Sequence, residues 1–355
     1  MFKKRPILKY ILSKGLWYLF TFFATVTIVF ILPRLGGANP VDIIMGKVAS
    51  GLSSEAAQKK EEAYLKEFNL VKTDKDGRII RDESGAPVKT SVFKQYFNYL
   101  CMTIRFDFGT SFLYYPKKVK EIMADAIIWD FFLQVPAIVL GWILGNILGA
   151  LAAYKRGVFD KVLFPASLFI SSIPFFAFGL LLLFIFAIVW PIFPSAGGYA
   201  ENIIPSFSWD FLSSLGFHYT LPFLSIFLVI IGDYSIGMRS MGIYELGTDY
   251  IKYAKSLGIK EFTIMWYVFR NGLLPQLAGV AILLGQIIGG ALVAEIIFSY
   301  PGLGTTILHA IQGNDYSLIQ GTSIVVAIMI LIANFSVDIL IGIFDPRVRA
   351  GIKGV

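Results

Sequence analysis

Charged residues are scarce in this chain. Asp, Glu, Lys and Arg together make up 15% of its 355 residues, whereas hydrophobic residues make up 56%, and the mean hydropathy is +0.69. A soluble domain with so little charge would not remain dissolved, because apolar side chains would cover too much of its exterior. The composition therefore excludes a soluble globular protein and predicts an integral membrane protein.

Cysteine, histidine and phosphate-binding motifs are also rare. The single cysteine, Cys101, excludes an internal disulfide and a thiolate metal site, and we interpret it as a small apolar residue. His218 and His309 lie on different predicted connections and make a poor metal pair. The only Gly-Lys pair, Gly46-Lys47, lacks the Ser or Thr of a phosphate-binding loop. These absences exclude ATP hydrolysis through such a loop, and they disfavour an intramembrane enzyme.

Long apolar runs are what the chain has instead. Six runs contain no charged residue, and they are continuously apolar rather than alternating, which is typical of membrane-spanning helices and not of barrel strands. Each approaches or exceeds the roughly 20 residues that a helix needs to cross a bilayer. The runs cover residues 15–33, 131–154, 162–200, 211–232, 271–294 and 316–337. The sequence therefore predicts an all-α integral membrane protein with six transmembrane helices.

Lysine and arginine mark one side of these predicted helices. Five precede the first run, three lie in 154–161, five in 239–270 and three after 344, whereas the connections 191–218 and 299–315 contain none. Short cytoplasmic connections carry an excess of positive charge, so this pattern places both termini and the two basic connections on the cytoplasmic side of the membrane. We expect this to be the membrane of a prokaryotic cell. The net charge of +7 is explained by this topology, without nucleic-acid binding.

The first connection is long and mixed in charge. It contains fifteen basic and twelve acidic residues, and it exceeds the roughly 60 residues over which the charge rule holds. We therefore divide the chain into a cytoplasmic N-terminus with the first transmembrane helix at 1–33, an extracytoplasmic region at 34–128 and a transmembrane core at 129–355. The core includes a cytoplasmic loop at 239–272. The apolar start resembles a secretory signal, but its core is too long, which favours a retained helix.

Three elements are predicted within the extracytoplasmic region. A helical stretch around 53–68 precedes a turn-rich stretch at 72–90, and a second helix is predicted at 91–103. Asp76-Gly77 between polar arms predicts a hairpin turn. A calcium loop is disfavoured, because no Glu closes it at the twelfth position.

Glycine and proline occur within the apolar runs, and a few acidic residues lie directly beside them. Glycine at every fourth position predicts that another helix approaches closely at Gly141, Gly145, Gly149, Gly285 and Gly289. Pro136 and Pro174 predict bends. A proton relay would need titratable groups at one depth, whereas the acids here lie near predicted helix ends, which favours interhelix hydrogen bonds: Asp130, Asp233, Glu295 and Asp338. An ion-coupled secondary transporter is disfavoured for the same reason, and because no internal repeat is evident.

The most polar interruption of the core reads DYIKYAKSLG at 249–258. Thr248 can cap a short helix, Asp249 suits its positive end, and Gly258 supplies a left-handed stop. One narrow apolar face is predicted at positions i, i+4 and i+7, namely Tyr250, Ala254 and Leu257, with Lys252 and Lys255 elsewhere. A helix this short is marginal alone in water, so we expect it to dock on another surface.

Residues 249–275, DYIKYAKSLGIKEFTIMWYVFRNGLLP, resemble the cytoplasmic EAA-type coupling loop of permease subunits in binding-protein-dependent ABC importers of the oligopeptide/dipeptide family. The signature positions are Ala254, Gly258, Arg270, Asn271, Leu274 and Pro275. Further resemblance follows in chain order: FDFGTSF at 106–112, SIPFFAFGLLL at 172–182, EIIFSYPGLG at 295–304, DYSLIQG at 315–321 and DPRVR at 345–349. Two segments depart from the family pattern: AIIWDFF at 126–132, which leads into the second predicted helix, and the charged insertion at 72–90. These departures leave the contacts with the substrate and with the binding protein open.

The resemblance implies a type I ABC importer permease fold and a transport role without enzymatic activity. It implies a heterodimer with a second permease subunit, two ABC ATPase subunits that bind ATP and Mg, an extracytoplasmic substrate-binding protein, and membrane lipid. This chain itself would bind no cofactor or metal. The ATPase-coupling residues would be Asp249, Tyr250, Lys252, Ala254, Lys255, Leu257, Gly258 and Pro275. Gly258 would let the chain reverse, and Pro275 would set where the fifth transmembrane helix restarts.

A second site is expected where SYPGLG forms a Pro-Gly turn before a short helix at 305–312, with Thr305 as cap and Gly313 as stop. With the loop at 191–218, it would form an external gate or contact the binding protein through Tyr300, Pro301, Gly302, Leu303 and Gly304. The alternative is a plain connector. For the substrate, oligopeptides are favoured over cello-type oligosaccharides, and the residues that contact it are not identifiable.

Overall fold

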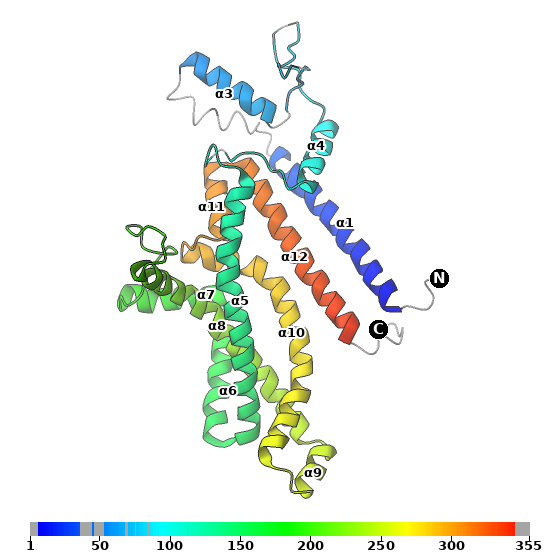
Figure 1. Ribbon diagram of the computed structural model, residues 1–355, viewed down its shortest axis with the longest axis vertical. Helices are drawn as coiled ribbons and strands as arrows, with labels where there is room; N and C mark the ends of the chain where they lie inside the picture. Colours follow the sequence, from blue (N-terminus) through cyan, green and yellow to red (C-terminus); the bar gives the residue numbers. More distant parts are fainter. Residues whose placement is uncertain are drawn as a thin grey trace. The chain divides into compact units, whose positions relative to one another are not determined.

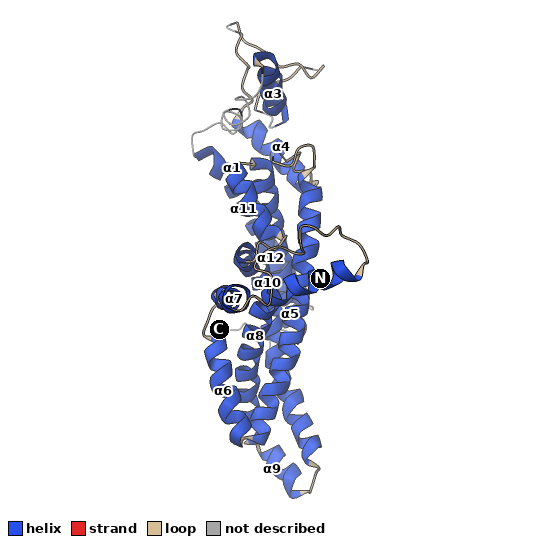
Figure 2. Cartoon of the chain, turned by 90° about the vertical axis from the view of Figure 1, so that its left-hand side faces the viewer, coloured by secondary structure: helices blue, strands red, loops and turns tan. Residues whose placement is uncertain are grey.

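The computed structural model describes residues 6–35, 45, 53–67, 70–74, 76–83, 85–111 and 113–344. Within these ranges the chain is helical apart from loops and a few isolated β-bridges (Figures 1 and 2). The helices are α1 (Pro6–Leu35), α3 (Ser54–Glu67), α4 (Val92–Ile104), α5 (Val119–Lys155), α6 (Gly157–Ser171), α7 (Phe175–Leu183), the π-helix η3 (Phe184–Val189), α8 (Trp209–Leu246), α9 (Asp249–Ser256), α10 (Glu261–Ile297), α11 (Leu303–Gly313) and α12 (Tyr316–Phe344).

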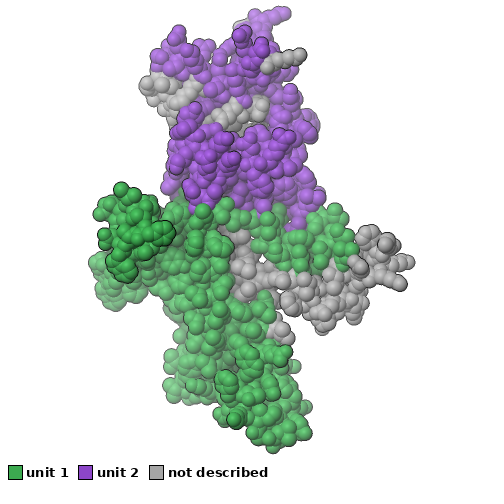
Figure 3. All heavy atoms as spheres, in the orientation of Figure 1, with its two compact units in different colours: residues 1–16, 126–305, 329–355 green, residues 17–125, 306–328 purple. Residues whose placement is uncertain are grey.

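Two compact units make up the chain (Figure 3). Unit 1 contains residues 1–16, 126–305 and 329–355, and unit 2 contains residues 17–125 and 306–328. Unit 1 holds both expected functional segments, and it contains an apolar core built from α5, α7 and α8 together with Phe298 and Tyr300.

Four described helical segments are long and apolar enough to cross a membrane: Tyr10–Leu32, Val119–Lys155, Trp209–Leu246 and Tyr316–Ser336. The pair α6 and α7–η3 counts as a fifth if it is one bent span. The remaining predicted helix, at 271–294, lies within α10, which has 37 residues. The side chains from 280 to 291, including the predicted glycine pair at 285 and 289, lie outside the described part.

The run at 162–200 is not one straight helix, contrary to the prediction. α6 and α7 meet at an angle of 99° across a break at residues 172–174. Pro174 cannot donate a backbone hydrogen bond and disfavours helical geometry at the residue before it, so α6 stops there and Pro174 becomes the N-cap of α7. The Ser172 hydroxyl donates to the Leu168 carbonyl at 2.6 Å and satisfies an acceptor of the last turn. Pro136, by contrast, lies inside an uninterrupted α5.

The predicted close approach of a helix to the glycine stripe of α5 is confirmed, and the partner is α8. A Cβ on Gly145 would lie 2.8 Å from the Tyr234 Cβ, and one on Gly149 would lie 2.4 Å from the Ser235 carbonyl oxygen. The Ser235 hydroxyl also donates to the Gly145 carbonyl at 3.2 Å. Only glycine permits this contact, which holds α5 and α8 together along the core of unit 1.

The three elements predicted between the first and second apolar runs are present in unit 2. α3 and α4 lie close to their predicted positions. Isolated antiparallel bridges pair residue 71 with 89, residue 73 with 79 and residue 81 with 87. The predicted turn at Asp76-Gly77 is confirmed, because Gly77 has φ +76° and the Asp74 carboxylate accepts the Asp76 and Arg78 N–H groups at 2.9 and 2.8 Å. We call residues 70–90 the meander.

Candidate functional site

α9 lies between the end of α8 and the start of α10 (Figure 1). Ile251 and Ala254 are buried, with 0% and 6% exposure, and Ile251 packs in a small core with Ile264 and Val268 of α10. The predicted apolar face was therefore wrong in one member, because Ala254 is buried within its own chain. The periodicity that pairs Tyr250 with Ala254 does not distinguish an inward from an outward side chain.

Hydrogen bonds to backbone carbonyls are present at both ends of α9. Gly258 has φ +70°, its N–H donates to Lys255, and the Ile259 N–H donates to Ala254 at 3.2 Å, which together form a Schellman ending. The predicted left-handed stop is thus confirmed. Thr248 is the N-cap residue, but its hydroxyl donates to the Glu245 carbonyl at 2.6 Å and does not cap the helix as expected.

A hydrogen-bonded group joins α9 to both neighbouring helices. The Tyr250 hydroxyl donates to the Glu245 carboxylate at the end of α8, and the Asn271 amide of α10 donates to the Tyr250 oxygen at 2.8 Å. Burial, together with the hydrogen bond to Glu245, raises the pKa of Tyr250, so its hydroxyl stays protonated and can donate at neutral pH. A displacement of α9 would therefore be transmitted to α8 and α10.

The outward face of α9 is apolar in its centre and charged around it. Tyr250, Tyr253 and Leu257 are 42%, 66% and 61% exposed and recur at i, i+3 and i+7 along one face. We call these three residues the α9 stripe. Exposed polar residues surround it, namely Asp249, Lys252 and Lys255. The sequence interpretation missed Tyr253, although its spacing from Tyr250 and Leu257 was visible.

Pro275 does not mark the start of a helix. α10 begins at Glu261 and runs through Pro275 to Ile297 without interruption. The prediction that the fifth transmembrane helix restarts at Pro275 was wrong. α10 is therefore a continuous rod of about 55 Å, at ~1.5 Å per residue, with α9 at one end and the SYPGLG turn at the other.

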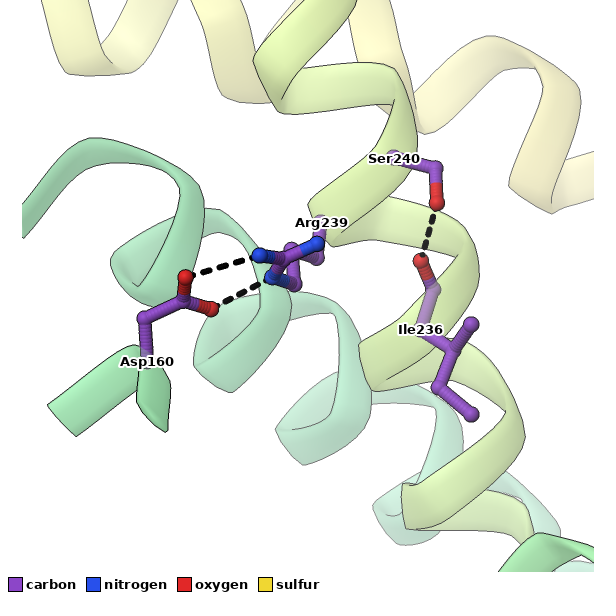
Figure 4. A network of polar contacts seen from close by, with 4 residues as sticks. All are labelled: Asp160, Ile236, Arg239 and Ser240. Carbon is purple, nitrogen blue, oxygen red and sulfur yellow. Dashed lines mark hydrogen bonds and ion pairs between the residues drawn. The ribbon is translucent and has the colours of Figure 1, made fainter. Parts of the chain in front are cut away.

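An ion pair holds α6 against α8 in unit 1 (Figure 4). The Arg239 guanidinium makes two parallel hydrogen bonds to the Asp160 carboxylate, one through Nη2 at 2.7 Å and the other through Nε. The same guanidinium lies 4.4 Å from the ring centroid of Phe164, one turn further along α6. Such a bidentate, stacked arrangement fixes both distance and orientation. Sequence reasoning counted Arg239 only as a topology signal.

Two acidic side chains accept hydrogen bonds from the backbone of the SYPGLG turn. We call residues 295–305 the α10–α11 turn. Asp130 of α5 accepts the Leu303 N–H at 3.1 Å, and Glu295 accepts the Gly304 N–H at 2.7 Å, which satisfies the first donors of α11. Gln134 donates to Glu295 at 3.3 Å. A Cβ on Gly302 would lie 2.1 Å from an Asp130 oxygen, so glycine is required at this position.

α11 differs from its predicted boundaries. It begins at Leu303 and not at residue 305, and Gly313 is its last residue. Asn314, with φ +55°, occupies the left-handed position expected for glycine. Thr305 is not the cap, because its hydroxyl donates to the carbonyls of Tyr300 and Gly302 at 2.6 and 3.0 Å. Tyr300 and Leu303 are almost completely buried, so they are packed inside unit 1 and are not available at its surface.

The structure brings the α10–α11 turn together with residues 190–208, whereas the last part of the loop expected at 191–218 belongs to α8, which begins at Trp209. The Gly197 N–H donates to the Phe298 carbonyl at 2.9 Å, and a Cβ on Gly198 would lie 2.9 Å from Pro301. Trp129 of α5 lies between them, with its ring 6.2 Å from Tyr199 and 5.5 Å from Tyr300. Loop, turn and helix α5 thus form one packed assembly at this end of α10.

Three of the four acids near predicted helix ends make the interhelix hydrogen bonds that were predicted. Asp130 and Glu295 bind the α10–α11 turn, and Asp338 of α12 contacts Tyr10 and Lys14 of α1 at 3.3 and 3.1 Å. Asp233 is exposed on α8. Among the described residues, no group of three His, Cys, Asp or Glu side chains could hold a metal ion.

Comparison with known proteins matches this chain to membrane components of transport systems. A family model described as binding-protein-dependent transport system inner membrane component matches residues 145–350. The chain is 31% identical over 262 residues to the dipeptide transport system permease protein DppB of Bacillus subtilis (strain 168), with 73% of this chain and 80% of the relative covered. It is 29% identical over 260 residues to the metal-staphylopine import system permease protein CntB of Staphylococcus aureus (strain NCTC 8325 / PS 47), with 73% and 78% covered. For DppB of Haemophilus influenzae, 28% identity extends over 359 residues, 96% of this chain and 99% of the relative.

Proposed function

This chain belongs to the family of binding-protein-dependent transport system inner membrane components, and from that premise we propose that it forms half of the translocation pathway for di- and oligopeptides. The family makes it a multi-pass permease subunit of an ABC importer, a transport component and not an enzyme. With α10 included, the chain would have six membrane-spanning helices. Both termini and α9 would face the cytoplasm, in agreement with the distribution of Lys and Arg.

The proposed complex has four further subunits. A second, related permease subunit would complete the pathway, two ABC ATPase subunits would bind ATP and Mg, and an extracytoplasmic protein would deliver the substrate. In support, the sequence lacks a phosphate-binding loop of the G-x-x-x-x-G-K-[ST] type, so the energy for uphill transport has to come from partner chains.

The observation that carries this proposal is the construction of α9. Its buried face docks on α10 through Ile251, while the α9 stripe is exposed. An apolar centre with a charged rim is the composition of a protein–protein contact. Seated in a cleft of an ATPase subunit, α9 would carry the closure of that subunit as a rigid-body displacement into α8 and α10.

The α10–α11 turn would form part of the gate at the opposite end of α10. Its packing against loop 190–208 and α5 supports this proposal, because a displacement of α10 would move all three together. Leu303 is fully buried, so a probe belongs at exposed Ser299 instead. A spin label at Ser299→Cys should change its distance to the second permease when ATP is added. An unchanged distance would leave the turn as a plain connector.

For the substrate, we favour peptides because relatives over most of the chain are named dipeptide permeases. The relative named for metal-staphylopine import makes such a metal complex the second candidate. Cello-type oligosaccharides remain the alternative from the sequence. Uptake of radiolabelled dipeptide, metal complex and cello-oligosaccharide by proteoliposomes containing the complete importer distinguishes the three.

Substitution of the α9 stripe tests the coupling role. We expect Tyr253→Ala/Leu257→Asp to abolish co-purification of the ATPase subunits and ATP-dependent uptake, while the permease pair still assembles. Ile204→Asp, at an 83% exposed position of the loop at 190–208, is the control for ATPase co-purification, which it should leave unchanged. ATPase binding and uptake that survive the double substitution would remove α9 as the coupling element.

A further inference from the structure

α4 has an apolar face that no described residue of unit 2 covers. Phe93, Phe97 and Ile104 are 88%, 64% and 57% exposed. With the partly exposed Leu100 they recur at i, i+4, i+7 and i+11, which places the four side chains in one stripe along the helix. We call these four residues the α4 stripe. Its neighbours around the helix include exposed Lys94 and Arg105, so α4 is amphipathic.

The other side of α4 is attached to α1. The Tyr96 and Thr27 hydroxyls are hydrogen-bonded at 2.8 Å, and the rings of Tyr96 and Tyr99 lie 5.2 and 5.4 Å from that of Phe30. Both α1 residues belong to the last turns of the apolar segment Tyr10–Leu32. α4 is therefore held at the level where this membrane-spanning segment ends.

This attachment level identifies what covers the stripe. Around Thr27 and Phe30, α1 exposes Ile28, Ile31 and Leu32 at 57%, 43% and 61%, and in a spanning helix these face lipid. Because α4 is attached to α1 through Thr27 and Phe30, its exposed stripe lies near the level of the boundary between acyl chains and headgroups. Phenylalanine and leucine on one face, with Lys and Arg on another, are typical of helices that lie in this boundary.

We propose that α4 is an interfacial helix, whose α4 stripe inserts into the bilayer surface on the side where α1 ends. The ligand is phospholipid, and it is bound by apolar burial and by the positive charges beside the stripe. A contact between the stripe and a second protein is the competing outcome.

Insertion would also orient the meander. The Gln95 amide donates to the Thr90 carbonyl at 2.9 Å, and the Thr90 N–H donates to the Leu70 carbonyl at 2.8 Å, so the first turn of α4 is tied to the end of the meander. α4 would then hold this extramembrane segment at a fixed height above the membrane and in a fixed direction relative to α1.

Site-directed spin labelling tests the proposal. Cys101→Ala removes the only cysteine, and labels are introduced as Phe97→Cys on the stripe or Lys94→Cys beside it. Both positions are exposed, so the labels should not disturb folding, and co-purification of the other subunits verifies assembly. The complex is reconstituted in nanodiscs of phosphatidylethanolamine and phosphatidylglycerol, and accessibility to oxygen and to a water-soluble nickel chelate is measured.

We expect the label at 97 to have a ratio of oxygen to nickel accessibility at least three-fold higher than the label at 94. Equal ratios would overturn the proposal. Protection of position 97 that appears only after the substrate-binding protein is added would also overturn it, in favour of a protein contact.

Discussion

The Glu295 carboxylate accepts a hydrogen bond of 2.7 Å from the backbone N–H of Gly304, nine positions further along the chain. Asp130, from a different helix, accepts the N–H of Leu303 in the same way. Carboxyl oxygens at the start of a helix satisfy donors that have no partner within the helix. Because both acids are buried, they tie α5, α10 and α11 into one piece at this point.

Removing the Glu295 carboxylate should destabilise this junction. Glu295→Ala leaves the Gly304 N–H and the Gln134 amide without an acceptor, so we expect a loss of about 1–3 kcal/mol in the free energy of unfolding. Glu295→Gln keeps one acceptor oxygen and should lose less. Thermal unfolding of the detergent-solubilised complex measures both variants. Equal melting temperatures for Glu295→Ala and the wild type would contradict the proposed role of this hydrogen bond.

The contact between α5 and α8 should not tolerate a methyl group. Gly149→Ala places a Cβ 2.4 Å from the Ser235 carbonyl oxygen, so the helices have to separate. We expect a destabilisation of about 1–3 kcal/mol, as for overpacked cores, measured as a lower melting temperature. Gly216→Ala is the matched control on α8, because its Cβ meets nothing within 4 Å. Helix propensity predicts that the control is neutral or slightly stabilising.

A double-mutant cycle should detect the ion pair between α6 and α8. Arg239→Ala leaves the Asp160 carboxylate without its partner at 17% side-chain exposure. We therefore expect the two single substitutions to add up to a larger destabilisation than the double substitution causes, and the difference gives a coupling free energy of about 1–3 kcal/mol. Chemical denaturation of the four proteins gives this value. A coupling near zero would mean that the pair contributes geometry without measurable stability.

The two faces of α9 should respond differently to truncation. Ile251 is fully buried, so Ile251→Ala should lower the free energy of unfolding by about 2–4 kcal/mol through a cavity. Leu257→Ala, on the exposed stripe, should change it by less than about 0.5 kcal/mol and should reduce ATPase binding instead. Melting temperature and co-purification separate the two effects. A stability loss of similar size in both variants would show that Leu257 packs on its own chain.

Local chemistry in the sequence was sufficient for several elements. The turn at Gly77, the left-handed end of α9 at Gly258 and the close contact along Gly141, Gly145 and Gly149 were predicted correctly. Each depends on residues that are neighbours in the chain or on a property that only glycine has. The break at Pro174 was anticipated as a bend, but its angle of 99° was not, because the angle depends on what α7 packs against.

The candidate site shows where such reasoning ends. Tyr250, Ala254 and Leu257 form a plausible helical face, yet Ala254 is buried and Tyr253 is exposed. The difference arises because α9 docks on α10 through Ile264 and Val268, a contact that no local pattern specifies. In the same way, the ion pair of Arg239 with Asp160 joins residues 79 positions apart.

The sequence by itself determined that this chain lies in a membrane, which segments are apolar enough to span it and which family it belongs to, because composition, charge distribution and motifs are properties of the chain. Only the tertiary structure decided which face of α9 is free, that α10 is continuous through Pro275, and that Asp130 and Glu295 meet at the start of α11. These are set by contacts between distant segments, whose burial and hydrogen bonding select one arrangement among many that local propensities allow.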